Sequence, residues 1–156
     1  MYPVANLVPH RPPMLLLDEL LSHDSHSATC VVTLRENAPF MCRGRVPAIV
    51  AMEYLAQCVA AFATLHPDPG AEAEPTTQEA LASLGSPRIG YLVGIRGLNL
   101  AIDHFDLGDR LLVTVKHVWG SGQGAQFTGA VNRDGEAVVT GSLTVFVPPE
   151  GAGALL

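Results

Sequence analysis

The feature that most constrains the fold is a long apolar segment near the middle of the chain. It runs from Ala48 to Leu65, follows Pro47, and consists of good helix formers without Gly or Pro. We therefore predict a helix, and because its apolar residues surround it on all sides, we expect it to be enclosed in a core. A segment of about 18 apolar residues also suits a membrane span. We reject that interpretation because Glu53 and Gln57 interrupt the segment and strand patterns follow it.

Strand patterns occupy most of the remaining chain. Two apolar, partly β-branched runs, residues 14–22 and 28–34, flank a turn and predict a first hairpin. A hairpin turn is predicted at Asp134-Gly135. Four further strands are predicted at 89–101, 110–119, 126–131 and 137–147. Residues 67–87 are rich in Pro, Gly, Glu, Ala and Thr and predict a flexible connection, with a short helix around 77–84.

These elements predict a single α+β domain over residues 1–156. A chain of this length, with 48% of its residues apolar, can bury a substantial core. The economical packing is a curled antiparallel sheet of about five to six strands wrapped around the long helix.

The composition argues against several classes of function. A net charge of −6 with nine scattered basic residues does not suit a nucleic-acid partner. Cys30, Cys42 and Cys58 have no zinc-binding spacing, so we expect reduced thiols and no metal. The N-terminus does not resemble a signal peptide, and we expect a soluble, cytoplasmic protein. If the partner is an acidic protein, Arg43 and Arg45 would have to form the local patch that binds it.

Glu53 and Gln57 form the only strongly polar pair of the predicted helix. They are four residues apart and project from the same face. A carboxylate in apolar surroundings can donate or accept a proton, because burial disfavours its charged form. A structural role, with Glu53 hydrogen-bonded to Gln57 or to the sheet, is an equally open interpretation. At the helix start, the N–H groups of Ala48, Ile49 and Val50 can polarise a carbonyl oxygen.

The six histidines stand in different contexts. Solvent, capping or half-buried roles are expected for His23 and His26 in the predicted turn, His66 at the helix end, and His117 in a strand. His104 lies in an acid-His-acid pattern, D-H-F-D, that suits a metal or catalytic site, although a solvated loop is the favoured interpretation. His10 stands in the rigid segment P-H-R-P-P-M, which leads into a predicted strand.

Two motifs resemble those of bacterial 3-hydroxyacyl-[acyl-carrier-protein] dehydratases. Residues 9–18, P-H-R-P-P-M-L-L-L-D, resemble the family's opening motif P-H-R-x-P-x-L-L-x-D. Residues 46–57, V-P-A-I-V-A-M-E-Y-L-A-Q, resemble its helix motif M-P-G-V-L-x-x-E-x-x-A-Q. The resemblance implies a hot-dog fold and a homodimer or heterodimer of hot-dog subunits. It also implies dehydration of a 3-hydroxyacyl thioester carried on the phosphopantetheine of an acyl carrier protein or on coenzyme A, with no other cofactor.

The same resemblance implies roles for individual residues. Glu53 would be the acid-base carboxylate, Gln57 its support, and the amides of Ala48, Ile49 and Val50 would bind the thioester. The family also uses a histidine from a G-H-F-P motif, which this chain lacks.

A closer resemblance is to a divergent branch, the small dehydratases of aryl polyene biosynthesis. It rests on P-A-I-V-A-M-E-Y-L-A-Q at 47–57 and on G-Y-L-V-G-I-R at 90–96. Within this pattern His10 is the histidine that belongs to a motif, and we hypothesise that it replaces the missing partner of Glu53. The alternative, that His10 only fixes the N-terminal turn, is equally open.

Three functions fit these residues. The first is dehydration of a 3-hydroxyacyl thioester to the enoyl thioester, as in fatty acid or polyene biosynthesis. The second is hydrolysis of an acyl thioester by a hot-dog enzyme with one helix carboxylate. The third is a non-catalytic subunit whose partner in a heterodimer supplies the missing histidine.

Overall fold

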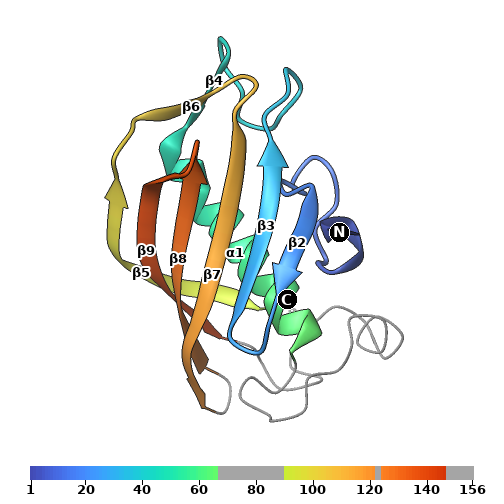
Figure 1. Ribbon diagram of the computed structural model, residues 1–156, viewed down its shortest axis with the longest axis vertical. Helices are drawn as coiled ribbons and strands as arrows, with labels where there is room; N and C mark the ends of the chain where they lie inside the picture. Colours follow the sequence, from blue (N-terminus) through green and yellow to red (C-terminus); the bar gives the residue numbers. More distant parts are fainter. Residues whose placement is uncertain (67–89, 122–123, 147–156) are drawn as a thin grey trace.

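One helix lies against the concave side of a strongly curved sheet in the computed structural model, which describes residues 1–66, 90–121 and 124–146 (Figure 1). Helix α1 (Ala51–Leu65) continues directly from a 3₁₀ turn, η2 (Ala48–Val50). The predicted helix is therefore confirmed, and its first three residues adopt the tighter form that is frequent at helix ends.

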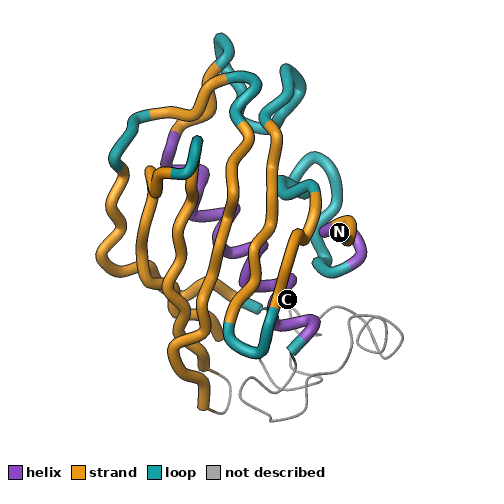
Figure 2. Tube along the Cα trace, viewed as in Figure 1, coloured by secondary structure: helices purple, strands orange, loops and turns teal. Residues whose placement is uncertain are grey.

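The main sheet has seven strands in the order β1-β2-β3-β7-β8-β9-β5, and each strand is antiparallel to its neighbours. The strands of this sheet cross in front of the helix in Figure 2. The helix packs mainly against β3, β7 and β8 in its middle. A separate two-stranded sheet joins β4 to β6. The strands are β1 (Tyr2–Pro3), β2 (Glu19–His23), β3 (Ser27–Thr33), β4 (Arg45–Pro47), β5 (Tyr91–Leu100), β6 (His104–Asp106), β7 (Arg110–Ser121), β8 (Gly124–Arg133) and β9 (Glu136–Phe146). A 3₁₀ turn, η1 (Val4–Asn6), follows β1.

This arrangement confirms the predicted α+β class and the curled antiparallel sheet around one helix. The turn at Asp134-Gly135 is also confirmed, because both residues have the positive φ values, 52° and 86°, of a tight hairpin turn. The sheet has seven strands instead of about five to six. The extra strand β1 has only two residues, too few for a recognisable pattern. The predictions for 67–87, including a helix at 77–84, lie outside the described residues.

The first predicted strand is wrong in its N-terminal half, because β2 begins only at Glu19. The preceding residues look strand-like in sequence because they are a run of leucines. In the structure, however, the Met14 carbonyl and the Leu16 N–H are hydrogen-bonded to a side chain of the helix. Backbone groups used in this way cannot join a strand ladder.

The core fills the space between the helix and the sheet. Leu55, Cys58 and Phe62 of the helix are completely buried, as is Leu143 of β9. Burial raises the pKa of the Cys58 thiol, whose Sγ donates to the Val113 carbonyl at 3.3 Å. All three cysteines are free, as predicted.

The length and composition of the helical segment would allow it to cross a membrane, since its mean hydropathy over the 18 residues Ala48–Leu65 is 1.6. More than half of that segment, 56%, is buried inside the protein, beneath the sheet. It is therefore a core helix, as the sequence indicated.

One side of the helix is not covered by the sheet. Its residues, which we call the open face, are Ile49, Met52, Glu53, Ala56, Ala60 and Ala63. Ile49 is 48% exposed, and the other five are partly buried. The expectation of a fully enclosed helix is therefore wrong for this side, and the predicted acid-base residue Glu53 lies on it.

Gly129 of β8 lies directly against the helix. A Cβ atom at this position would approach Leu55 Cδ2 to 2.7 Å and Leu143 Cδ1 to 3.1 Å. Both leucines are completely buried. We expect Gly129→Ala to lower the free energy of unfolding by about 1–3 kcal/mol, the usual cost of overpacking, as measured by urea denaturation.

Gly141 provides the matched control, because it lies directly opposite Gly129 on β9. A Cβ atom there meets Ile95 Cγ2 and Leu98 Cδ1, each at an ordinary contact distance of 3.5 Å. Gly141→Ala should change the free energy of unfolding by less than about 0.5 kcal/mol. Equal losses for the two variants would show that the contacts with Leu55 and Leu143 do not exclude a side chain at Gly129.

Candidate active site

Glu53 lies in the first turn of α1, and its side chain is 35% exposed. Gln57 follows one turn later and is completely buried. Gln57 Nε2 donates a hydrogen bond to Glu53 Oε1 at 2.9 Å. The predicted meeting of these two side chains on one face of the helix is therefore confirmed.

Gln57 also holds a distant part of the chain. Its Oε1 accepts a hydrogen bond from the Leu16 N–H at 3.0 Å, and its Nε2 donates to the Met14 carbonyl at 2.7 Å. Since the oxygen faces a donor and the nitrogen faces acceptors, only one orientation of the amide satisfies all three contacts. The helix thereby anchors the segment that follows His10.

The residues between His10 and this anchor form a compact turn. The Arg11 carbonyl accepts hydrogen bonds from the N–H groups of Met14 at 2.9 Å and Leu15 at 3.2 Å. The Arg11 guanidinium donates to the carbonyls of Val8 at 2.9 Å and His10 at 2.7 Å. These bonds hold the backbone of His10 close to the anchored segment.

His10 lies beside Glu53 within the same chain. His10 Nε2 is 3.5 Å from Glu53 Oε1, with the two side chains 32% and 35% exposed. This separation suits an ion pair and is slightly longer than a good hydrogen bond. The other ring nitrogen, Nδ1, is buried and has no hydrogen-bond partner among the described residues. The structure thus brings together the two residues that the sequence motifs proposed as a pair.

The start of the helix differs from the prediction. The Ala48 N–H donates to the Asp103 carbonyl at 2.9 Å, so it is not free to hold a substrate carbonyl. The first N–H groups of a helix lack partners within it, so Ile49 and Val50 stay predicted binding groups. Ile49 is the more accessible of the two, with 48% exposure. The sequence did not reveal the loss of Ala48, because Asp103 is far away along the chain.

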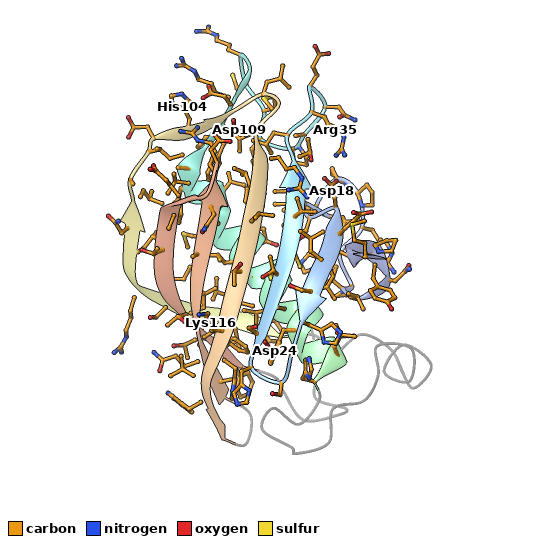
Figure 3. All side chains as sticks on the ribbon, in the orientation of Figure 1. Asp18, Asp24, Arg35, His104, Asp109 and Lys116 are labelled. Atoms are coloured by element: carbon orange, nitrogen blue, oxygen red, sulfur yellow. The ribbon has the colours of Figure 1, made fainter. Side chains whose placement is uncertain are left out.

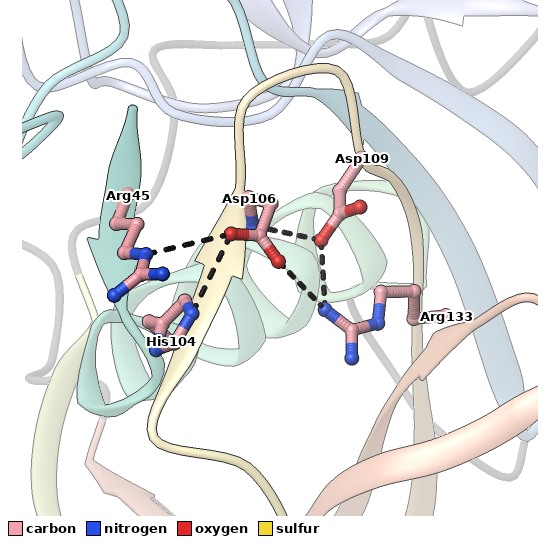
Figure 4. A network of polar contacts seen from close by, with 5 residues as sticks. All are labelled: Arg45, His104, Asp106, Asp109 and Arg133. Atoms are coloured by element: carbon pink, nitrogen blue, oxygen red, sulfur yellow. Dashed lines mark hydrogen bonds and ion pairs between the residues drawn. The ribbon is translucent and has the colours of Figure 1, made fainter. Parts of the chain in front are cut away.

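His104 belongs to a polar network on the two-stranded sheet (Figure 4). The Asp106 carboxylate lies 3.4 Å from His104, 3.7 Å from Arg45 and 3.6 Å from Arg133, which also contacts Asp109 at 3.1 Å. His104 is the first residue of strand β6, so the prediction of a loop at this residue is wrong. No group of three or more potential metal ligands occurs among the described residues. The network fixes β6 and leaves Arg45, half of the predicted basic patch, already paired.

Asp18, the last residue of the opening motif, has a structural role. Its Oδ2 accepts the Thr33 N–H at 2.8 Å, and its Oδ1 accepts a bond from Arg35 at 2.9 Å. Asp18 and Arg35 lie on neighbouring segments at one end of β2 and β3 (Figure 3). The motif is thus fastened to the sheet by Asp18 and to the helix by Gln57.

Three other histidines gather around Phe62, far from Glu53. The rings of His66 and His117 stack near Phe62 at centroid distances of 4.7 Å and 6.2 Å, and His23 Nδ1 is 3.1 Å from His66 Nε2. Burial, followed by the nearby His26, lowers the pKa of His117. His66 is the C-cap residue, but its ring is buried with 6% exposure. The sequence signal for this buried ring was the spacing of His66 four residues after Phe62, which places the two side chains on the same face of the helix.

Comparisons with known proteins agree with this architecture. A family model described as "ApeP-like: ApeP dehydratase" matches residues 2–155. A 3-hydroxyacyl-[acyl-carrier-protein] dehydratase FabZ from Anaeromyxobacter dehalogenans strain 2CP-1 is 28% identical over 141 residues, which cover 86% of this chain and 81% of that protein.

Solved structures show the same fold. The dehydratase heterocomplex ApeI:P from Xenorhabdus doucetiae matches with a TM-score of 0.78 at 24% identity, covering 96% of this chain and 93% of that chain. Zebra fish thioesterase superfamily member 2 matches with a TM-score of 0.62 at 14% identity, covering 92% and 91%. These similarities confirm the hot-dog fold.

The role of Gln57 as an anchor can be tested directly. Gln57→Ala leaves the Leu16 N–H and the Met14 carbonyl without their partner inside the protein. The Leu16 N–H is buried, and an unpaired buried group costs about 1–3 kcal/mol, whereas Met14 is exposed and its carbonyl loses less. We therefore expect the free energy of unfolding, measured with urea, to fall by roughly 2–4 kcal/mol.

Thr64→Ala is the matched control, because Thr64 makes one hydrogen bond, from its hydroxyl to the Leu7 carbonyl at 2.8 Å. Both residues tie the helix to the N-terminal segment, but Thr64 is only partly buried. A loss of about 1 kcal/mol is expected for this variant. If Gln57→Ala costs no more than Thr64→Ala, Gln57 is not the principal anchor.

Proposed function

The chain belongs to the ApeP-like family of dehydratases and has a 3-hydroxyacyl-thioester dehydratase-like function, and from this premise we propose that it is itself catalytic. The proposed reaction removes water from a 3-hydroxyacyl thioester and forms the enoyl thioester. Glu53 is the proposed acid-base group, with His10 as its partner and Gln57 as its support.

The contact between Glu53 Oε1 and His10 Nε2, 3.5 Å long, is the observation that carries this proposal. The elimination requires a group that removes the proton from C2 and delivers a proton to the departing 3-hydroxyl. A carboxylate beside an imidazole, partly exposed at a helix start, is suited to that task. The contact also supports the hypothesis that His10 replaces the family's motif histidine, which this chain lacks.

The helix start supports the same reaction. Removal of the C2 proton places negative charge on the thioester oxygen, which N–H groups at a helix N-terminus stabilise. Ile49 and Val50 are the proposed donors, because Ala48 is already bonded to Asp103. They lie about one turn before Glu53, so one substrate can contact both.

We propose that the thioester is carried on the phosphopantetheine of an acyl carrier protein. The name of the A. dehalogenans relative specifies this carrier. Of the predicted basic patch, Arg43 is exposed and makes no ion pair within the described residues, so it is the proposed contact for the carrier's acidic surface.

We further propose that the chain works as one half of a pair of hot-dog subunits. Among the described residues, strand β5 is the last strand of the sheet, and no strand pairs with its outer edge. Tyr91, Val93 and Leu100 are exposed on this ten-residue strand. A long apolar edge of this kind is prone to pair with another strand. The solved relative from X. doucetiae is described as a heterocomplex, which favours a partner of the ApeI kind.

Glu53→Gln tests the chemistry. The chain, alone and mixed with an ApeI-type subunit, is given a 3-hydroxyacyl thioester while enoyl product and free thiol are both measured. We expect enoyl formation by the unmodified chain and a rate about 10²–10⁴ lower for Glu53→Gln, the usual contribution of a general acid-base group. Glu136→Gln, an exposed position at the start of β9, should behave as the unmodified chain.

Other outcomes separate the alternatives. Release of free thiol without enoyl product would indicate a thioester hydrolase. If Glu53→Gln leaves the activity of the mixture unchanged while the chain is still required for it, the chain is a non-catalytic partner.

The pairing edge can be tested with a charge. Val93→Lys places an ammonium group on β5, a substitution that disfavours strand pairing. We expect it to lower the affinity for the ApeI-type subunit, or for a second copy of the chain, at least tenfold in analytical ultracentrifugation. Val118→Lys is the matched control, because Val118 is similarly exposed, 53% against 61%, on the interior strand β7. Equal effects of the two substitutions would argue against β5 as the interface.

A further inference from the structure

Within the proposed function, we propose that Glu53 Oε2 carries out both proton transfers, and that His10 is a positioning residue that does not contact the substrate. This inference rests on the proposed dehydratase activity. It assigns a role to each polar atom of the pair.

The two oxygens of Glu53 have different surroundings. Oε1 accepts a hydrogen bond from Gln57 Nε2 at 2.9 Å and faces His10 Nε2 at 3.5 Å. No polar side chain of the described residues contacts Oε2, although the Glu53 side chain is 35% exposed. The hydrogen bond from Gln57 and the His10 ring beside it stabilise negative charge on Oε1, so a proton taken up by Glu53 resides on Oε2. Oε2 is therefore the atom able to exchange a proton with a substrate.

The two nitrogens of His10 have different surroundings. Nε2 faces Glu53, while Nδ1 is buried without a partner among the described residues. A neutral imidazole carries one N–H and one lone pair. The N–H on Nε2 meets a carboxylate oxygen, whereas an N–H on Nδ1 would be buried and unpaired, at greater cost. His10 consequently directs the N–H of Nε2 toward Oε1, and its buried Nδ1 is not available to a substrate.

The elimination then balances with one carboxylate. Glu53 Oε2 takes the proton from C2, and the electron pair of that C–H bond forms the double bond between C2 and C3. The bond between C3 and oxygen breaks, and the departing hydroxyl takes the same proton back from Oε2 and leaves as water. Glu53 ends as the carboxylate with which it began, so no second acid or base is required.

Conservative and disruptive variants of His10 separate positioning from proton transfer. His10→Gln keeps an N–H donor at a reach similar to that of Nε2, but cannot accept and release a proton. His10→Phe keeps the ring and removes the donor. Both are compared with Glu53→Gln in whichever assembly of the unmodified chain is active, with kcat and KM measured separately and folding monitored by urea denaturation.

We expect His10→Gln to keep kcat within about tenfold of the unmodified chain, far above Glu53→Gln, which loses the full 10²–10⁴ of an acid-base group. His10→Phe should lower kcat more than His10→Gln and leave KM within about twofold, because the histidine stabilises Glu53 and does not bind substrate.

Three results would overturn this assignment. A loss in His10→Gln as large as that in Glu53→Gln would show that His10 transfers a proton. Unchanged kcat in His10→Phe would show that His10 does not position Glu53. A rise in KM with unchanged kcat in either His10 variant would show that His10 contacts the substrate. Absence of dehydration by the unmodified chain in every assembly would instead reject the proposed function itself.

Discussion

The geometry of the candidate site depends on the buried amide of Gln57. This side chain joins the helix to Leu16 and Met14, which lie 41 and 43 positions away in sequence, and also bonds Glu53. A completely buried amide with every contact made is rigid, because any movement would leave a polar atom unpaired in the core. The position of His10 beside Glu53 therefore follows from backbone hydrogen bonds of its neighbours, and not from strong interactions of the imidazole itself.

The accuracy of the sequence-based predictions depended on how local each feature is. The helix and the pairing of Glu53 with Gln57 were predictable, because propensity and i, i+4 spacing are properties of a short segment. The irregular backbone of residues 14–18 was not predictable. A run of leucines indicates a strand unless its long-range hydrogen bonds to Gln57 are known. The Ala48 amide was misjudged for the same reason, because its acceptor, Asp103, comes from another part of the chain. Motif resemblance identified His10, whereas composition alone gave it no special weight.

The uncovered side of the molecule connects the chemistry with the proposed assembly. Glu53 lies on the open face of the helix, which the sheet does not cover. A subunit that covers apolar side chains on this side would also limit the access of water to the carboxylate. Exclusion of water strengthens electrostatic interactions within a site. Covering the open face would therefore bury apolar side chains and also change the surroundings of the Glu53 carboxylate.

The presence of His10 and Glu53 in one polypeptide has a consequence for how such proteins diverge. When two interacting residues come from different subunits, a new partner must supply the missing one, and both genes are constrained together. Here both residues belong to one chain, so the contact does not depend on a residue that a partner supplies. The surface that selects the partner is therefore free to change under mutation and selection without breaking the contact between the imidazole and the carboxylate.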